Sequence, residues 1–211
     1  MKKYISKFHY LTQDLSDRTH IDQVISACEA GANWIQYRCL SKNDKELVSE
    51  INEIAVICDD WGATLIITDH YHLLDMVDVQ GVHLENLQAD FIAIREQIGD
   101  DKTLGGSANS LDDILRIASL GVVDYIGCGL YAVTLTKPND YAVLGFSGYK
   151  SIVSDLAATG IKMPVLAVGG ITLSDVDELM ETGIYGIAVC GAVNKAENPK
   201  LAVREFYKKV C

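Results

Sequence analysis

Gln36 and Arg38 are the residues whose type and spacing most directly suggest chemistry. They lie two residues apart at the end of the apolar run that begins at Trp34, so in an extended strand both face the same side. An arginine that faces the interior of a protein needs an anion, because an unpaired buried guanidinium is costly. That anion is either a phosphate group of a ligand or a carboxylate of the chain, for example Asp69 in a structural ion pair.

Thr68 and Asp69 follow the apolar run 65–67. A carboxylate at the end of a buried strand can hold Mg²⁺, an ion that proteins bind through few carboxylates together with substrate phosphates. Aspartate is also a good helix N-cap, and a helix is expected to begin at Tyr71. The residue alone favours neither interpretation, metal ligand or helix cap.

A cluster of polar groups occupies the segment from Thr134 to Pro138. It contains two hydroxyls, Thr134 and Thr136, and the ammonium of Lys137. Hydroxyls, backbone amides and a lysine on a constrained turn suit the binding of an oxyanion. The alternative is a solvated loop that has no ligand.

Two strand-like runs late in the chain end in glycine. Gly169 and Gly170 follow Val165–Val168, and Gly191 follows Ile187–Cys190. Glycine lets backbone amides approach a ligand closely, because it carries no side chain. Two such strand ends in neighbouring βα units form the usual phosphate cradle of a (β/α)8 barrel. The alternative is that these glycines only make tight turns.

Segments typical of strands and helices alternate along the chain, which predicts an α/β fold. The expected strands are Tyr4–Leu11, Trp34–Arg38, Thr64–Thr68, Gly81–Leu84, Thr103–Ser107, Asp124–Cys128, Val165–Val168 and Ile187–Cys190. Helices are expected between them, including Thr19–Ala30, Asn43–Asp60 and Leu111–Leu120, the last capped by Ser110. Eight βα units predict a single TIM-barrel domain of the phosphate-binding type over residues 1–211, with a doubly wound open sheet as the competing architecture.

Composition limits the partners and the compartment. The formal charge of −11 and the pI near 4.8 argue against nucleic acid or an anionic membrane as a partner. No stretch resembles a signal peptide or a membrane span, and the six cysteines are dispersed without a Cys-x-x-Cys pair, which favours a reduced, cytoplasmic protein. His9, His70 and His72 are expected at helix starts or on the surface, since their spacing does not suggest a metal cluster.

Six segments of the chain resemble those of the thiamine-phosphate synthase (thiamine-phosphate pyrophosphorylase) family, which includes the related thiazole tautomerase. They are Trp34–Arg38, Leu65–Asp69, Gly81–Leu84, Asp124–Gly127, Thr134–Pro138 and Ala167–Ile171. The segments come in the family's order and cover nearly the whole chain. The Gln-x-Arg, Ile-Ile-x-Asp and Thr-x-Thr-Lys-Pro patterns are the specific ones, whereas the glycine motifs are common to many phosphate-binding barrels.

The resemblance implies a Mg²⁺-dependent transferase of thiamine biosynthesis that joins hydroxymethylpyrimidine pyrophosphate to hydroxyethylthiazole phosphate. In that reaction pyrophosphate leaves first, and the thiazole nitrogen captures the pyrimidine carbocation. The implied residues are Arg38, Lys137 and Ser107 for catalysis, Gln36, Thr68, Thr134, Thr136, Gly169, Gly170, Cys190 and Gly191 for substrate binding, and Asp69 and Gln88 for the metal. The implied partners are small phosphorylated molecules, and both a monomer and a homodimer remain open.

The chain departs from the family pattern at five positions. They are Leu40 (lysine in the family), Thr68 (asparagine), Gln88 (the second metal carboxylate), Asn109 (the proton-transferring histidine of the tautomerase) and Gly191 (commonly serine). Glu85 or Asp90 lies close enough in sequence to replace the missing carboxylate. A weaker grip on pyrophosphate makes a divergent or non-catalytic phosphate-binding paralogue the alternative, and a Schiff-base aldolase that uses Lys137 is a further one.

Overall fold

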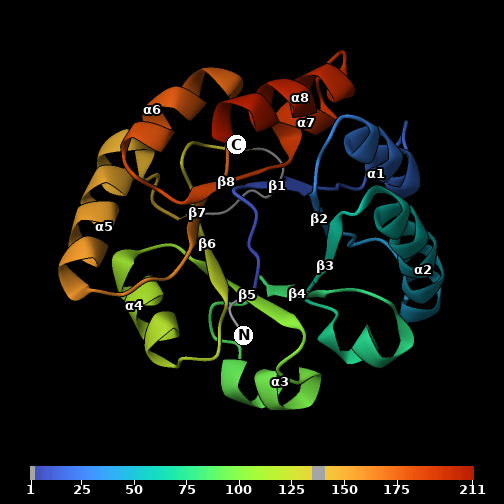
Figure 1. Ribbon diagram of the computed structural model, residues 1–211, viewed down its shortest axis with the longest axis horizontal. Helices are drawn as coiled ribbons and strands as arrows, with labels where there is room; N and C mark the ends of the chain where they lie inside the picture. Colours follow the sequence, from blue (N-terminus) through green and yellow to red (C-terminus); the bar gives the residue numbers. More distant parts are fainter. Residues whose placement is uncertain (1–2, 135–140) are drawn as a thin grey trace.

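The computed structural model describes residues 3–134 and 141–211. Eight parallel strands close into a barrel in chain order, and the helices form a ring around it (Figure 1). The strands are β1 (Phe8–Leu11), β2 (Trp34–Tyr37), β3 (Thr64–Thr68), β4 (Gly81–Leu84), β5 (Thr103–Ala108), β6 (Tyr125–Gly129), β7 (Val165–Val168) and β8 (Gly186–Val189). The predicted (β/α)8 barrel is confirmed, and the open sheet is excluded because β1 pairs with both β2 and β8.

Several of the helices begin at residues whose side chains cap them. The helices are α1 (His20–Glu29), α2 (Asp44–Trp61), η1 (Tyr71–Met76), α3 (Phe91–Ile98), α4 (Leu111–Ser119), α5 (Gly145–Thr159), η2 (Leu173–Asp175), α6 (Val176–Glu181), α7 (Gly191–Asn194) and α8 (Pro199–Val210). Within the described part of the chain, η1, α5, α6 and α7 have no side-chain cap. Thr19 and Asn43 form capping boxes, and the Ser110 hydroxyl accepts from the Asp113 amide at 3.1 Å, as predicted. Among the helices of residues 3–134 and 141–211, none is long and apolar enough to cross a membrane.

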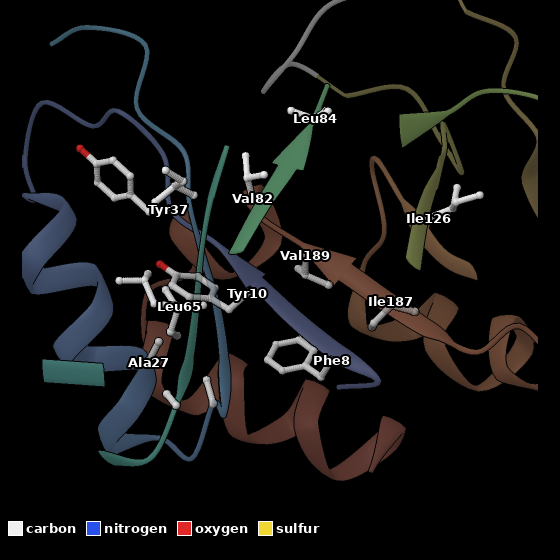
Figure 2. Packing of buried hydrophobic residues seen from close by; sticks show 14 of the residues in the cluster. Phe8, Tyr10, Ala27, Tyr37, Leu65, Val82, Leu84, Ile126, Ile187 and Val189 are labelled. Atoms are coloured by element: carbon white, nitrogen blue, oxygen red, sulfur yellow. The ribbon is translucent and has the colours of Figure 1, made fainter. Parts of the chain in front are cut away.

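The side chains of each strand alternate between an outer and an inner layer. In the outer layer, Phe8 and Tyr10 of β1 and Ile187 and Val189 of β8 lie between the strands and the helices (Figure 2). The ring of Phe8 stacks on Phe206 of α8 with 6.2 Å between the centroids. Burial of these apolar side chains attaches the helices to the barrel.

Inside the barrel, near the amino ends of the strands, the inner layer is built from aromatic side chains. His9 of β1 stacks on Trp34 with 4.3 Å between centroids, and Tyr125 meets the histidine edge-on. Tyr125 fits because β5 has a glycine opposite it: a Cβ on Gly105 would lie 2.3 Å from the tyrosine ring. His9 is 1% exposed, so the prediction of a helix-start or surface histidine is wrong for this residue.

Three elements differ from the expected ones. The first strand is Phe8–Leu11 rather than Tyr4–Leu11, because Ile5 turns into the apolar cluster inside the barrel with Trp34 and Tyr125. Figure 1 shows this amino-terminal segment crossing the end of the barrel before it reaches β1. The helix expected at Tyr71 is the 3-10 helix η1, and the short helix α7 after β8 was not predicted.

Candidate active site

Two cavities adjoin at the carboxyl ends of the strands, where barrels of this kind carry their chemistry. The first has a volume of about 350 Å³ and the second about 230 Å³. The residues that line both cavities are Leu11, Glu85, Leu130, Val168 and Ala188. Because the cavities share this wall, two ligands bound in them would lie next to each other.

The rim of the first cavity is made by the glycines that follow β7 and β8. Gly169 and Gly170 have φ angles of +92° and +70°, a region that disfavours side chains. A Cβ would lie 2.5 Å from the Leu130 side chain at the first position and 2.5 Å from the Ala132 carbonyl oxygen at the second. Backbone conformation and crowding therefore both require glycine here. Gly191, the first residue of α7, lines the same cavity.

Cys190 and Lys195 also line the first cavity, the first as a neutral group and the second as a cation. Burial raises the pKa of the Cys190 thiol to about 11, so the thiol stays neutral and presents no negative charge to a ligand. Lys195, which ends the short helix α7, lines the cavity as a cation. Lys195 is not among the residues predicted from the sequence.

The second cavity is lined by polar side chains from β2, β4 and the end of β5: Gln36, His83, Ser107 and Asn109. The Gln36 amide donates to the Thr68 hydroxyl at 3.0 Å, which fixes the direction of the glutamine. With its nitrogen facing β6, the Asn109 amide donates to the Gly129 carbonyl at 3.1 Å. Predicted substrate-binding residues Gln36 and Thr68 are thus in contact.

Ser107 belongs to a chain of hydrogen bonds that starts inside the barrel. The Tyr125 hydroxyl lies 3.1 Å from Nδ1 of His83, and Nε2 of His83 lies 3.0 Å from the Ser107 hydroxyl. Burial raises the pKa of Tyr125, so this hydroxyl stays protonated. The tautomer of His83 decides which group donates in each of these two hydrogen bonds.

Arg38 is buried at the wall of the first cavity and holds a carboxylate of the chain. Its Nε donates to Oε1 of Glu85 at 2.8 Å and its Nη2 to Oε2 at 3.4 Å. Burial pushes the pKa of Arg38 down, but the hydrogen bond and the charge of Glu85 raise it above the ordinary value. The sequence-based alternative of an ion pair is therefore present, with Glu85 in place of Asp69.

Comparison with known proteins assigns this barrel to a family. The family model described as "Thiamine monophosphate synthase" matches residues 9–193. The chain belongs to this family. It is 36% identical over 193 residues to the thiamine-phosphate synthase of Phocaeicola vulgatus, covering 92% of each chain, and 33% identical over 205 residues to that of Flavobacterium johnsoniae, covering 97% and 96%. The solved thiamine phosphate pyrophosphorylase from Pyrococcus furiosus superposes with a TM-score of 0.83 at 29% identity, over 97% of this chain and 95% of that one.

Asp69, the predicted metal residue of this thiamine monophosphate synthase family member, has a strained backbone. Its φ is +62°, unusual for a residue with a side chain, and its Oδ1 accepts from the Glu85 amide at 2.7 Å. Its carboxylate does not cap η1, so the helix-cap interpretation is wrong. The hydrogen bond fixes the Asp69 carboxylate beside Glu85, the first residue after β4. Proteins bind Mg²⁺ through one or two carboxylates together with the phosphates of a ligand.

Gln88, the second predicted metal residue, lies in an exposed turn where its backbone amide donates to the Asn86 side chain at 2.9 Å. Asp90, which the sequence offered as a substitute, is the N-cap of α3 and accepts from the Ala93 amide at 3.0 Å. Glu85 is the other candidate, and its backbone adjoins Asp69. Of the predicted metal carboxylates, Asp69 and Glu85 are therefore the two that adjoin, through the hydrogen bond from the Glu85 amide to Asp69.

The loop after β6 is only partly described. Thr134 lines the first cavity, opposite the glycine rim. Thr136 and Lys137 lie outside the described residues, so their predicted roles in substrate binding and catalysis stay predictions. The Schiff-base alternative also depends on Lys137 and stays untested.

Proposed function

We propose that this chain is a transferase that couples hydroxymethylpyrimidine pyrophosphate to hydroxyethylthiazole phosphate, forming thiamine phosphate and releasing pyrophosphate. Membership of the thiamine monophosphate synthase family supports this activity. The observation that carries it is the pair of adjoining cavities, one with a bare glycine rim and one with polar walls. We further propose that it acts in the cytoplasm as a single domain over residues 1–211.

The first cavity would bind the thiazole phosphate. Gly169, Gly170 and Gly191 line this cavity, so their backbone amides would bind the phosphate, and Lys195 would add a positive charge. The neutral thiol of Cys190 adds no repulsion. The apolar wall that both cavities share would then hold the thiazole ring next to the pyrimidine.

The second cavity and Arg38 would bind the pyrimidine and its pyrophosphate. Gln36 offers an amide to the ring, and Arg38 and Ser107 face the leaving group. The bond between the pyrimidine methylene carbon and the diphosphate oxygen breaks with its electron pair on the oxygen. The thiazole nitrogen then donates its lone pair to the methylene carbon, so the carbon–nitrogen bond forms and the charge moves to the thiazolium.

Positive charge and hydrogen bonds at the leaving oxygen accelerate this departure. Arg38 supplies a guanidinium, and the Ser107 hydroxyl, which lies 3.0 Å from Nε2 of His83, would donate a hydrogen bond to the leaving oxygen. Asp69, with Glu85 beside it, would hold Mg²⁺, which when bound supplies charge to the diphosphate. The predicted role of Lys137 on the same leaving group adds a further cation.

The proposal is tested by incubating the purified protein with both substrates and Mg²⁺ and measuring thiamine phosphate by its oxidation to a fluorescent thiochrome. We expect product above a control without protein. Absence of product, with both substrates shown to be intact, would overturn the assignment.

One observation favours a binding protein as the second candidate: the predicted anion-binding Arg38 is already paired with Glu85. A phosphate-binding paralogue would keep the glycine rim but lose the pyrophosphate site. Calorimetry separates the two, because the paralogue binds thiazole phosphate and shows no Mg²⁺-dependent binding of the pyrimidine pyrophosphate.

A further inference from the structure

Arg38 holds the Glu85 carboxylate in the geometry with which an arginine binds a phosphate group. Two nitrogens of one guanidinium face two oxygens of one carboxylate, at 2.8 and 3.4 Å. The side chains are 8% and 17% exposed, so solvent screens the pair only partly. An arginine binds a phosphate group with this same two-point geometry. Among the described residues, Glu85 is the only acceptor of hydrogen bonds from the Arg38 guanidinium.

The position of Glu85 puts its charge where the proposed ligands would bind. Glu85 follows β4 directly and lines both cavities. A carboxylate there repels any phosphorylated ligand unless it moves or is neutralised. Its backbone amide is fixed to the Asp69 carboxylate, so the side chain can move while the main chain stays in place.

We propose that Glu85 is an internal competitor for Arg38: its carboxylate occupies the guanidinium in the empty site and must release it when a diphosphate binds. The inference rests on the proposed function, because it takes Arg38 as the diphosphate ligand. Glu85 sets how tightly the diphosphate binds, since every binding event has to break this ion pair. The Glu85 backbone adjoins Asp69, so a divalent cation that binds there with the diphosphate would compensate the charge of the released carboxylate.

The decisive measurement is the affinity of inorganic pyrophosphate by calorimetry, with EDTA present so that no divalent cation takes part. Glu85→Gln keeps the size of the side chain and removes its charge. We expect the variant to bind pyrophosphate about tenfold more tightly than the natural chain, because a charged hydrogen-bonded pair no longer has to be broken. With Mg²⁺ the gain shrinks, since only the natural chain offers the cation a second carboxylate.

A double-mutant cycle separates competition for Arg38 from simple repulsion. If Glu85 acts by occupying Arg38, then Glu85→Gln has little effect on affinity once Arg38→Gln has been made. If Glu85 only repels anions through space, the tenfold gain persists in that background and the inference is wrong. Asp124→Asn is the matched control, because it breaks an arginine–carboxylate pair at the opposite end of the barrel; we expect it to leave pyrophosphate affinity unchanged.

The outcomes distinguish this inference from the proposed function. Equal pyrophosphate affinity of the natural chain and Glu85→Gln overturns the competition and leaves the transferase standing. The expected cycle without any thiamine phosphate formation supports the competition and counts against the transferase. Failure of every variant to bind pyrophosphate in EDTA, with melting temperatures showing that all are folded, overturns the competition. Failure to bind it in the presence of Mg²⁺ as well overturns both.

Discussion

The two ends of the barrel each bury an arginine–carboxylate pair, and the two pairs differ in what else the arginine contacts. At the amino end, Arg95 of α3 donates to Asp124 at 2.7 Å. It also donates to the backbone carbonyls of Gly99, Lys102 and Val122 at 2.6–3.0 Å. At the carboxyl end, the guanidinium of Arg38 donates, among the described residues, only to Glu85.

The carboxylates show the same contrast. Asp124 accepts from Arg95, from Lys3 at 3.0 Å and from the Leu104 amide at 2.8 Å, so it fastens three parts of the chain together. Glu85 pairs with Arg38 on the wall of two cavities. Among the described residues, the Arg95 guanidinium makes four hydrogen bonds within the fold and stabilises it. The Arg38 guanidinium makes two and lines a cavity, where a ligand can reach it. This division matches the usual roles of the two faces of a TIM barrel.

The largest expected effect comes from Arg38→Gln. The proposed transferase loses two charged hydrogen bonds to its diphosphate, and Glu85 loses its arginine partner, so kcat/KM should fall by about 100-fold or more. Steady-state measurement of thiamine phosphate formation checks this. A variant that keeps kcat/KM within about threefold would show that Arg38 does not bind the ligand. The two arginines would then not differ in function.

The converse change is Asp124→Asn at the amino end. Breaking a partly buried ion pair there should lower the free energy of unfolding by about 2–3 kcal/mol, while kcat/KM of the folded protein stays within about twofold. Urea denaturation gives the first quantity and the activity assay the second. A variant with normal stability and reduced activity would contradict the structural role of this end.

A matched pair of glycines sharpens the comparison further. Gly170 at the cradle and Gly121 before β6 have φ angles of +70° and +69°, but a Cβ meets the Ala132 carbonyl only at Gly170 and nothing within 4 Å at Gly121. Alanine at either site should cost about 1 kcal/mol of stability from backbone strain. Only Gly170→Ala should also raise the KM for thiazole phosphate, by about tenfold, because it distorts the phosphate rim. An equal KM for thiazole phosphate in both variants would show that Gly170 does not form part of the phosphate site.

The fold and the glycine turn after β7 were predictable because each depends on local pattern. Apolar runs separated by helical segments define the eight strands. The consecutive glycines Gly169 and Gly170 indicate a turn with positive φ angles. The partner of Arg38 was not predictable in this way. Asp69 and Glu85 follow neighbouring strands, and the left-handed backbone of Asp69 turns its carboxylate to the Glu85 amide, which leaves Glu85 for the arginine.

His9 and Lys195 show the same limit. His9 is inside the barrel because Trp34 and Tyr125, from strands distant in sequence, form the stack that receives it. Lys195 reaches the first cavity through the unpredicted helix α7. Contacts between distant segments decide such positions, and no local pattern contains them.

The smallest expected effect tests whether the carboxyl end also holds purely structural charge. Asp14, after β1, accepts from the Leu40 amide at 2.9 Å and the Ser41 hydroxyl at 2.7 Å, and lies 3.2 Å from Nε2 of His20. Partial burial opposes ionisation, but these hydrogen bonds lower the pKa of Asp14 from 3.8 to about 2. A carboxyl whose pKa is lower in the folded state stabilises the fold above the unfolded pKa near 4, and loses this contribution as the pH falls toward 2.

Asp14→Asn removes this titration. Because the Asp14 side chain is 34% exposed, solvent weakens the effect, and we expect only about 1 kcal/mol of extra stability loss in the natural chain between pH 4 and 2. Urea denaturation at several pH values compares the two slopes. If both proteins lose stability equally with acid, Asp14 contributes nothing by its charge. A steeper slope in the natural chain would instead show that the carboxyl end of the barrel combines a structural carboxylate at β1 with a ligand-directed one at β4, so the functional division follows individual hydrogen-bond networks rather than the whole face.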